Sequence, residues 1–265
     1  MSPQRTPPPR KIRLRWLALA IIVAAVAWWF WHDRASAPTP KNTKAATTTH
    51  HDTPTAQPST FDFSAHSLTD PSSIWVIANK HNQLNPKDYV PTITLPNVPL
   101  KYSKDTENMH VSAVMAPHLK ELFDGATKAG YQLRLSSGYR SYSYQVKVYN
   151  SEVKAYGQAK ADAESARPGY SEHQTGLAAD VSPVSGTCDL SQCFGTTPEG
   201  KWLAANAYRY GFVIRYPQGK ESITGYEYEP WHIRYIGAEA ATEMHKEGVQ
   251  TLEEFFNLEP APSYN

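Results

Sequence analysis

Two histidines and two carboxylates in this 265-residue chain have the types and spacing of a catalytic zinc site. His173 and Asp180 lie in the stretch SEHQTGLAAD (171–180), and His232 comes much later, in EPWH (229–232). Catalytic zinc takes three protein ligands and leaves a fourth position for water. The sequence therefore predicts His173, Asp180 and His232 as the ligands of one Zn2+ ion, with Gly176 allowing the chain to turn between the first two.

A base and a cation complete the predicted chemistry. Glu229 lies three residues before His232, where a carboxylate beside the metal can serve as general base for a metal-bound water. Arg140 lies in a loop after a predicted strand and is suited to hold an oxyanion or a substrate carboxylate. By composition Glu227 competes with Glu229, and a histidine taken alone is more often an ordinary polar residue than a ligand. The residues alone thus indicate a metallohydrolase, and they leave open the alternative that these histidines are ordinary polar residues that bind no metal.

Short elements must position these residues. Apolar spacing predicts helices over 115–129, 144–156, 198–210, 238–246 and 251–257, with a shorter one within 158–166. Strands are predicted over 74–77, 131–136, 179–181, 212–217 and 227–235. The elements follow no βαβ rhythm, so the expected fold class is α+β.

The N-terminus carries signals for export. Five basic residues precede an uncharged apolar run over 16–31, and no acidic residue occurs before Asp33. We expect residues 1–34 to be a cytoplasmic tail and transmembrane signal-anchor. Residues 35–60, rich in Pro, Thr and Ala, are expected to be a disordered linker, and residues 61–265 the catalytic domain outside the cytoplasm. A signal peptide cleaved after the small residues 35–37 is the alternative. The net charge of +1 gives no reason to expect a nucleic-acid partner.

The chain has two cysteines, Cys188 and Cys193. Outside the cytoplasm a disulfide between them is expected, with a free pair or a metal role as the alternatives. They lie in a Ser/Gly/Thr-rich loop after Asp180.

Four blocks together carry a family resemblance: SGYRS with YQ (137–145), SxHxxGxAxD (171–180), GF with RYP (211–217), and EPWH (229–232). In this order they resemble the VanY-type D-alanyl-D-alanine carboxypeptidases, zinc peptidases that trim bacterial peptidoglycan stem peptides. The resemblance covers residues 74–237. It implies the fold shared with the hedgehog signalling domain, a small antiparallel sheet with flanking helices around one zinc site.

The same resemblance implies roles for individual residues. His173, Asp180 and His232 would bind zinc, Glu229 would be the base, and Arg140 would steady the tetrahedral intermediate or the substrate carbonyl. The residues implied to contact the peptide terminus are Ser137, Gln145 and Ser171. The cysteine-bearing loop departs from the family pattern and is expected to border the cleft.

The expected activity is removal of the terminal D-alanine from stem peptides by a monomer. An L,D-carboxypeptidase acting on tetrapeptides would use the same residues, and the sequence does not separate the two. The alternative from another class is a non-catalytic, zinc-containing wall-binding domain. The presence of Glu229 beside His232 argues against it, because a purely structural site has no need of a base.

Overall fold

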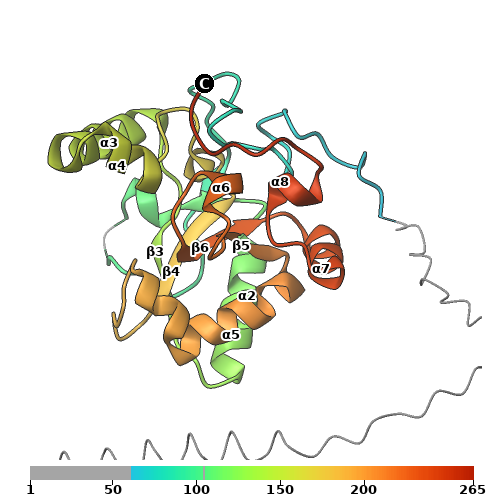
Figure 1. Ribbon diagram of the computed structural model, residues 1–265. Helices are drawn as coiled ribbons and strands as arrows, with labels where there is room; N and C mark the ends of the chain where they lie inside the picture. The colour runs from blue at the N-terminus through green and yellow to red at the C-terminus, as the bar shows by residue number, and fades with distance from the viewer. Residues whose placement is uncertain (1–60, 104) are drawn as a thin grey trace, which may run out of the picture. The chain divides into compact units, whose positions relative to one another are not determined.

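The centre of the fold is a four-stranded antiparallel sheet with the strand order β3-β4-β6-β5 (Figure 1). The computed structural model describes residues 61–103 and 105–265. The strands are β3 (Leu133–Ser137), β4 (Ala178–Pro183), β5 (Phe212–Tyr216) and β6 (Glu229–Tyr235). The register places Asp180 of β4 directly opposite His232 of β6. The sheet thus brings together two side chains that are 52 residues apart in the sequence.

Helices α2 (Ala116–Lys128) and α5 (Pro198–Asn206) contact the sheet and share its main apolar core. Leu119, Leu122 and Phe123 recur at helical spacing on α2 and are buried in this core. Helix α5 begins where the hydroxyl of Thr197 accepts a hydrogen bond from the Gly200 amide, as its capping sequence predicts.

Two other groups of helices flank the sheet (Figure 1). One is the pair α3 (Tyr142–Tyr156) and α4 (Gln158–Glu164). The other contains α7 (Ala238–Glu247) and α8 (Leu252–Phe255), which build a second apolar cluster with the segment around Trp75. The remaining elements are short: the paired strands β1 (Ile93–Thr94) and β2 (Val111–Ser112), helix α6 (Glu221–Thr224), and the 3-10 turns η2 (Glu107–Met109), η3 (Glu172–Thr175), η4 (Gln192–Thr196) and η5 (Ala207–Tyr210).

The α+β class and the small antiparallel sheets are confirmed, and most predicted elements agree within about two residues. Helix α3 starts earlier than predicted, at Tyr142, because the Ser141 side chain caps it.

The strand predicted over 74–77 is wrong. These residues are irregular chain, with Ile74 half-buried and 75–77 buried, and the carbonyls of Ile74 and Val76 accept hydrogen bonds from Arg234 in place of a neighbouring strand. The apolar run exists because Trp75 and Ile77 pack against α7 and α8.

The predicted anchor (1–34) and linker (35–60) lie outside the described residues. Within the described part of the chain, no helix has the length and apolar character needed to cross a membrane.

Candidate zinc site

Three side chains converge at the positions that the sequence predicts. His173 comes from η3, Asp180 from β4 and His232 from β6, and one donor atom from each lies within 4.8 Å of the others. His173 Nε2 is 3.4 Å from Asp180 Oδ2, and His232 Nδ1 is 3.4 Å from Asp180 Oδ1. Gly176, at φ 68°, makes the turn between η3 and β4. A Cβ there would lie only 2.8 Å from the Ser112 amide nitrogen, so the turn requires glycine.

The donor set fits one zinc ion. His173 Nε2 and Asp180 Oδ1 are buried and have no hydrogen-bond partner, although buried polar atoms are normally satisfied. Two imidazole nitrogens and one carboxylate oxygen are ligands that zinc accepts, and they leave a position open for water. Burial, followed by the charge of Arg140, lowers the pKa of His173 to about 4, which favours the neutral imidazole that binds a metal. Burial also lowers the pKa of His232, but the carboxylates of Asp180 and Glu172 outweigh it and raise this pKa to about 9.

The group on the far side of each histidine indicates which ring nitrogen faces the site: a hydrogen bond for His173 and a nearby carboxylate for His232. His173 Nδ1 lies 2.6 Å from the carbonyl oxygen of Gly138, which makes it the protonated nitrogen and leaves Nε2 for the metal. His232 Nε2 lies 3.4 Å from Glu172 Oε2, which leaves Nδ1 facing Asp180. The two histidines therefore present different nitrogens to the same point.

The role of Glu172 could not be predicted from the sequence, because it depends on partners far along the chain. Its buried carboxylate is 2.7 Å from Arg215 Nε and 3.0 Å from Arg234 Nη1. Burial raises the pKa of Glu172, but the two guanidinium groups outweigh it and hold the pKa well below its usual range. Arg215 in turn binds Glu253 through two hydrogen bonds of 2.9 and 2.7 Å. Glu172 is thus a fixed anion behind His232.

The structure places Glu229, and not Glu227, beside the ligands. Glu229 Oε2 lies 3.5 Å from His232 Nδ1. Burial raises the pKa of Glu229 to about 8, despite the opposing effect of His232. Glu227 is more exposed and pairs with Lys160 at 2.6 Å. The position of Glu229, next to the donor atoms but outside the ligand set, suits proton transfer.

Arg140 is the cation nearest to the ligands. Its Nη2 is 3.9 Å from Asp180 Oδ2, its Nη1 donates to Gln145 Oε1 at 3.1 Å, and its buried Nε has no partner. The other cationic residue that lines the cleft in the described chain, Lys101, is paired with Asp189 at 2.7 Å. Arg140 therefore has donor capacity left for an anionic group.

The three predicted pocket residues differ in what they touch. Ser137 and Ser171 line a cleft of about 610 Å³ that also contains the predicted zinc ligands and Glu229. Gln145 is fully buried, and its amide donates to Ser165 Oγ and the Ala166 carbonyl. All of the hydrogen bonds found for Gln145 are internal, and they position Arg140.

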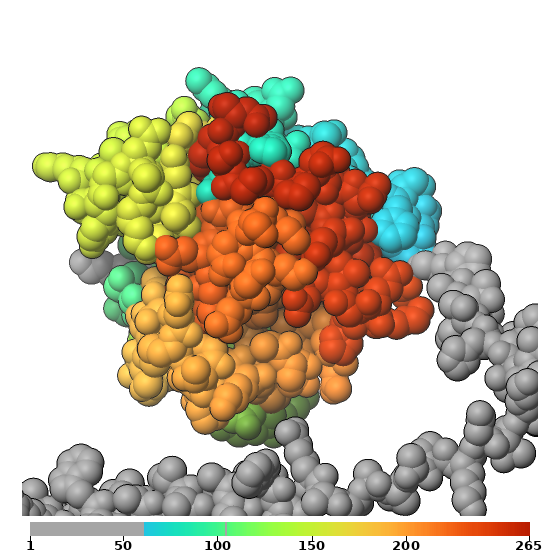
Figure 2. Space-filling model, in the orientation of Figure 1, coloured from blue at the N-terminus to red at the C-terminus, as the bar shows by residue number. Residues whose placement is uncertain are grey.

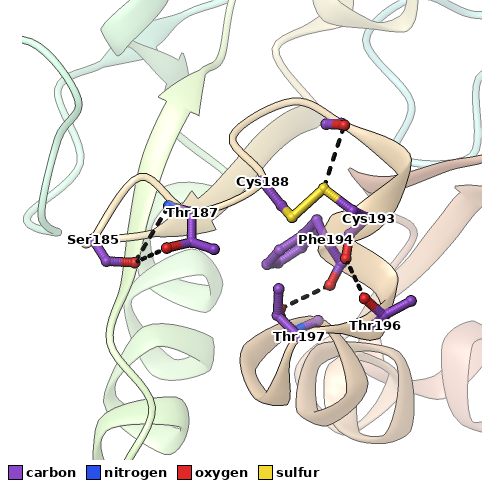
Figure 3. The surroundings of a disulfide bond; sticks show 9 residues. Ser185, Thr187, Cys188, Cys193, Phe194, Thr196 and Thr197 are labelled. Carbon is purple, nitrogen blue, oxygen red and sulfur yellow. Dashed lines mark hydrogen bonds between the residues drawn. A yellow bond between two sulfur atoms is a disulfide. The ribbon is translucent and has the colours of Figure 1, made fainter. Parts of the chain in front are cut away.

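The cleft is bordered by α3 and α4 on one side and by residues 190–192 on the other. These segments form the yellow-green and light-orange parts of the surface in Figure 2. The predicted disulfide is present: Cys188 and Cys193 are bonded, with their Cα atoms 5.5 Å apart (Figure 3). Five histidines of the described chain lie outside the metal cluster: His66, His81, His110, His118 and His245.

Comparisons with known proteins agree with this geometry. Residues 108–238 match the family model "VanY: D-alanyl-D-alanine carboxypeptidase". YodJ of Bacillus subtilis (strain 168), provisionally named a carboxypeptidase, is 44% identical over 190 residues, which are 71% of this chain and 69% of YodJ. The solved structure of the LD-carboxypeptidase LdcB is 45% identical and has a TM-score of 0.67, with 71% of this chain and 87% of that chain covered.

A third relative carries the metal. The structure of a variant of the vancomycin resistance D,D-pentapeptidase VanY, in complex with Zn(II), is 33% identical and has a TM-score of 0.54. The match covers 69% of this chain and 98% of that chain. The family match contains all three donor residues, Arg140 and Glu229, and the similarity to LdcB extends over most of both chains. The chain therefore belongs to the VanY family of D-alanyl-D-alanine carboxypeptidases.

Proposed function

We propose that this protein is a zinc-dependent carboxypeptidase that removes the terminal D-alanine from peptidoglycan stem peptides ending in D-alanyl-D-alanine. One observation carries the proposal. A buried set of two histidines and one aspartate lies in a cleft together with a carboxylate, Glu229, that is 3.5 Å from a ligand nitrogen and outside the ligand set. A site that only stabilised the fold would not need that carboxylate.

In this proposal Glu229 is the general base and then the general acid. A zinc ion held by His173, Asp180 and His232 would lower the pKa of a bound water and polarise the scissile carbonyl. Glu229 takes the proton that the attacking water loses and delivers it to the nitrogen of the leaving D-alanine. Burial raises the pKa of Glu229 to about 8. A nearby cation lowers this pKa and so favours the ionised carboxylate, which is the form that acts as a base.

Arg140 is proposed to stabilise negative charge on the reacting carbonyl oxygen. Its guanidinium is held by Gln145 on one side and faces Asp180 on the other, so it is already oriented before substrate binds. Donors that need no reorientation are the most effective for stabilising a transition state. Ser137 and Ser171 line the same cleft and are proposed to contact the peptide terminus.

A second candidate is L,D-carboxypeptidase activity on tetrapeptide stems. The observation that favours it is the similarity to LdcB, which exceeds that to the Zn(II)-bound VanY variant. The deciding experiment incubates the zinc-loaded protein with disaccharide pentapeptide and disaccharide tetrapeptide in parallel and identifies the products by mass. Conversion of pentapeptide to tetrapeptide supports the D,D assignment, and conversion of tetrapeptide to tripeptide supports the L,D assignment. If neither peptide is cleaved by protein that retains its zinc, the chain is a non-catalytic wall-binding domain.

We also propose that residues 1–34 anchor the protein in the cell membrane as a single span, with the catalytic domain outside the cytoplasm as a monomer. The basic residues ahead of the apolar run 16–31 and the disulfide, which is typical of oxidising compartments, support this proposal. Protease added to intact spheroplasts should remove the domain and leave the N-terminal segment in the membrane fraction. Full protection of the domain would refute the orientation. Light scattering of the detergent-solubilised protein tests whether it is a monomer.

A further inference from the structure

The disulfide encloses a piece of the cleft wall. Between Cys188 and Cys193 lie four residues, and Leu190, Ser191 and Gln192 all line the cleft that contains the predicted zinc ligands. The Leu190 residue is 39% exposed, although it is apolar. An exposed apolar side chain on a cleft wall is a contact surface for a ligand that brings apolar atoms.

Three attachments hold this segment in place. Asp189 accepts from Ser136 Oγ at 3.1 Å and pairs with Lys101 and Arg134 at 2.7 and 3.1 Å. After Cys193 the chain enters the core at Phe194, which is fully buried and points toward the disulfide (Figure 3). The third attachment is the disulfide, which joins the residues on either side of 189–192.

The backbone of the segment needs such restraint. Cys188 and Leu190 have positive φ values of 55° and 48°, in the left-handed region that residues with a Cβ occupy infrequently. The segment contains no glycine that would make this conformation easy. We expect the segment without the covalent link to have more backbone conformations available, including ones in which Leu190 and Gln192 leave the cleft wall.

The other side of the cleft is linked to the same segment. Gln192 Nε2 donates to Glu227 Oε2 at 3.4 Å, and Lys160 of α4 binds the other oxygen of Glu227 at 2.6 Å. Lys160 also pairs with Glu164, which lines the cleft. The residues between the two cysteines therefore form part of the cleft wall. They are also connected to α4 through polar contacts.

We propose that the Leu190–Gln192 segment, held by the Cys188–Cys193 disulfide, is a binding surface for the stem peptide, and that opening the disulfide weakens peptide binding without disturbing the metal ligands. This inference rests on the proposed substrate class. It adds which residues bind the peptide portion of that substrate. His173, Asp180 and His232 are fixed by the sheet and by Gly138 and Glu172, which are separate from this segment. The expected effect is thus on affinity for the peptide.

The opening step is thiol–disulfide exchange with a dithiol reductant. The S–S bond between Cys188 and Cys193 breaks, each cysteine sulfur gains one proton, and the two thiols of the reductant close to a disulfide. Two electrons pass from the dithiol to the protein. Cys193 is exposed and gives the reductant access.

The test measures binding of disaccharide tripeptide, which lacks both scissile bonds, to the full zinc-loaded protein by isothermal titration calorimetry. Dithiothreitol should raise the Kd about 3- to 10-fold, if the open segment keeps its binding conformation for roughly a tenth to a third of the time. The double variant Cys188→Ser, Cys193→Ser should show the raised Kd without reductant and no further change with it. Zinc content, measured after desalting, should stay at one ion per chain in every sample.

A second pair of variants keeps the disulfide. Leu190→Ala should raise the Kd for the tripeptide, whereas Val184→Ala, which removes an exposed apolar side chain outside the cleft, should leave it unchanged. In turnover assays the reduced protein should have a higher KM at unchanged kcat, which a general loss of folding would not produce.

The inference is overturned if the wild-type protein does not bind the tripeptide, or if its Kd changes less than twofold on reduction and in the Leu190→Ala variant. An equal effect of dithiothreitol on the double variant, with loss of zinc, would assign the change to chelation and also overturn it. Absence of D-alanine release, with the Kd shift intact, would refute the proposed activity and leave this inference standing.

Discussion

Replacing Glu172 by glutamine should weaken zinc binding as well as stability. The carboxylate lies behind His232 and is bound by Arg215 and Arg234, and the side chains of Glu172 and both arginines are completely inaccessible to solvent. Glutamine keeps the size of the side chain and removes its charge, which leaves the positive charges of both arginines undercompensated. Removing one partner of a buried ion pair costs about 3–5 kcal/mol in the free energy of unfolding.

The metal-specific part of the effect comes from His232. A carboxylate behind a ligating histidine fixes the orientation of the ring, and loss of such a partner typically lowers metal affinity about 10- to 100-fold. Glu253→Gln is the matched control, because Glu253 also binds Arg215 through two hydrogen bonds, and the partners of its carboxylate are Arg215 and Asn79. It should lose a similar amount of stability and keep its zinc affinity.

Zinc affinity is measured by competition with a chromophoric chelator, and stability by guanidinium titration followed by tryptophan fluorescence. Both variants are compared with the wild type at the same pH. Equal zinc affinity of the Glu172→Gln and Glu253→Gln proteins would refute the assignment of Glu172 as the group that positions His232. If the free energy of unfolding of Glu172→Gln equals that of the wild type, removing the buried charge has no cost, which would refute the stability prediction.

Three further outcomes follow from the site and its surroundings. Glu229→Ala should lower kcat by several orders of magnitude while one zinc ion remains bound, and near-normal release of D-alanine would remove Glu229 from its proposed role. Asp180→Ala should lose the metal, and stoichiometric zinc after dialysis would contradict its assignment as a ligand. The pKa of Glu253 is lowered in the folded protein, because Arg215 outweighs the effect of burial, so its contribution to stability is complete above the unfolded pKa of about 4.3 and is lost as the pH falls through the folded value. The unfolding free energy should therefore drop on acidification below about pH 4, and less steeply in Glu253→Gln; equal slopes would refute this source of acid sensitivity.

Features such as helix starts and tight turns are determined by a few adjacent residues, so the sequence predicts them. The start of α5 follows from Thr197 and Pro198, and the turn between His173 and Asp180 follows from Gly176. The predicted ligands also have the order of a known motif, so the resemblance brings them together without any knowledge of the fold. The information for the helix start and for the turn is local, whereas the ligand set follows from the order of four sequence blocks between residues 137 and 232.

Contacts between distant parts of the chain could not be predicted in the same way. Glu172 lies within the motif around His173, but its partner Arg215 is 43 residues away and is identified only once β5 and η3 are packed together. The segment 74–77 was predicted as a strand from its apolar residues. Its carbonyls are bound by Arg234, 160 residues from Ile74, and no local pattern distinguishes that arrangement from sheet pairing.

The turn η3 explains how the two ligating histidines keep a common geometry. His173 supplies one nitrogen to the site, and the adjacent Glu172 places its carboxylate 3.4 Å from Nε2 of His232, the other histidine. The turn is also joined to the loop that bears Arg140, because the Arg140 amide donates to the His173 carbonyl at 3.2 Å and His173 Nδ1 contacts the Gly138 carbonyl at 2.6 Å. A displacement of η3 would therefore move both histidines and the proposed oxyanion-binding residue together. This coupling gives a physical reason to bury so many charges near the cleft: they keep metal ligands from three different elements in one arrangement, at a cost in stability that the apolar core offsets.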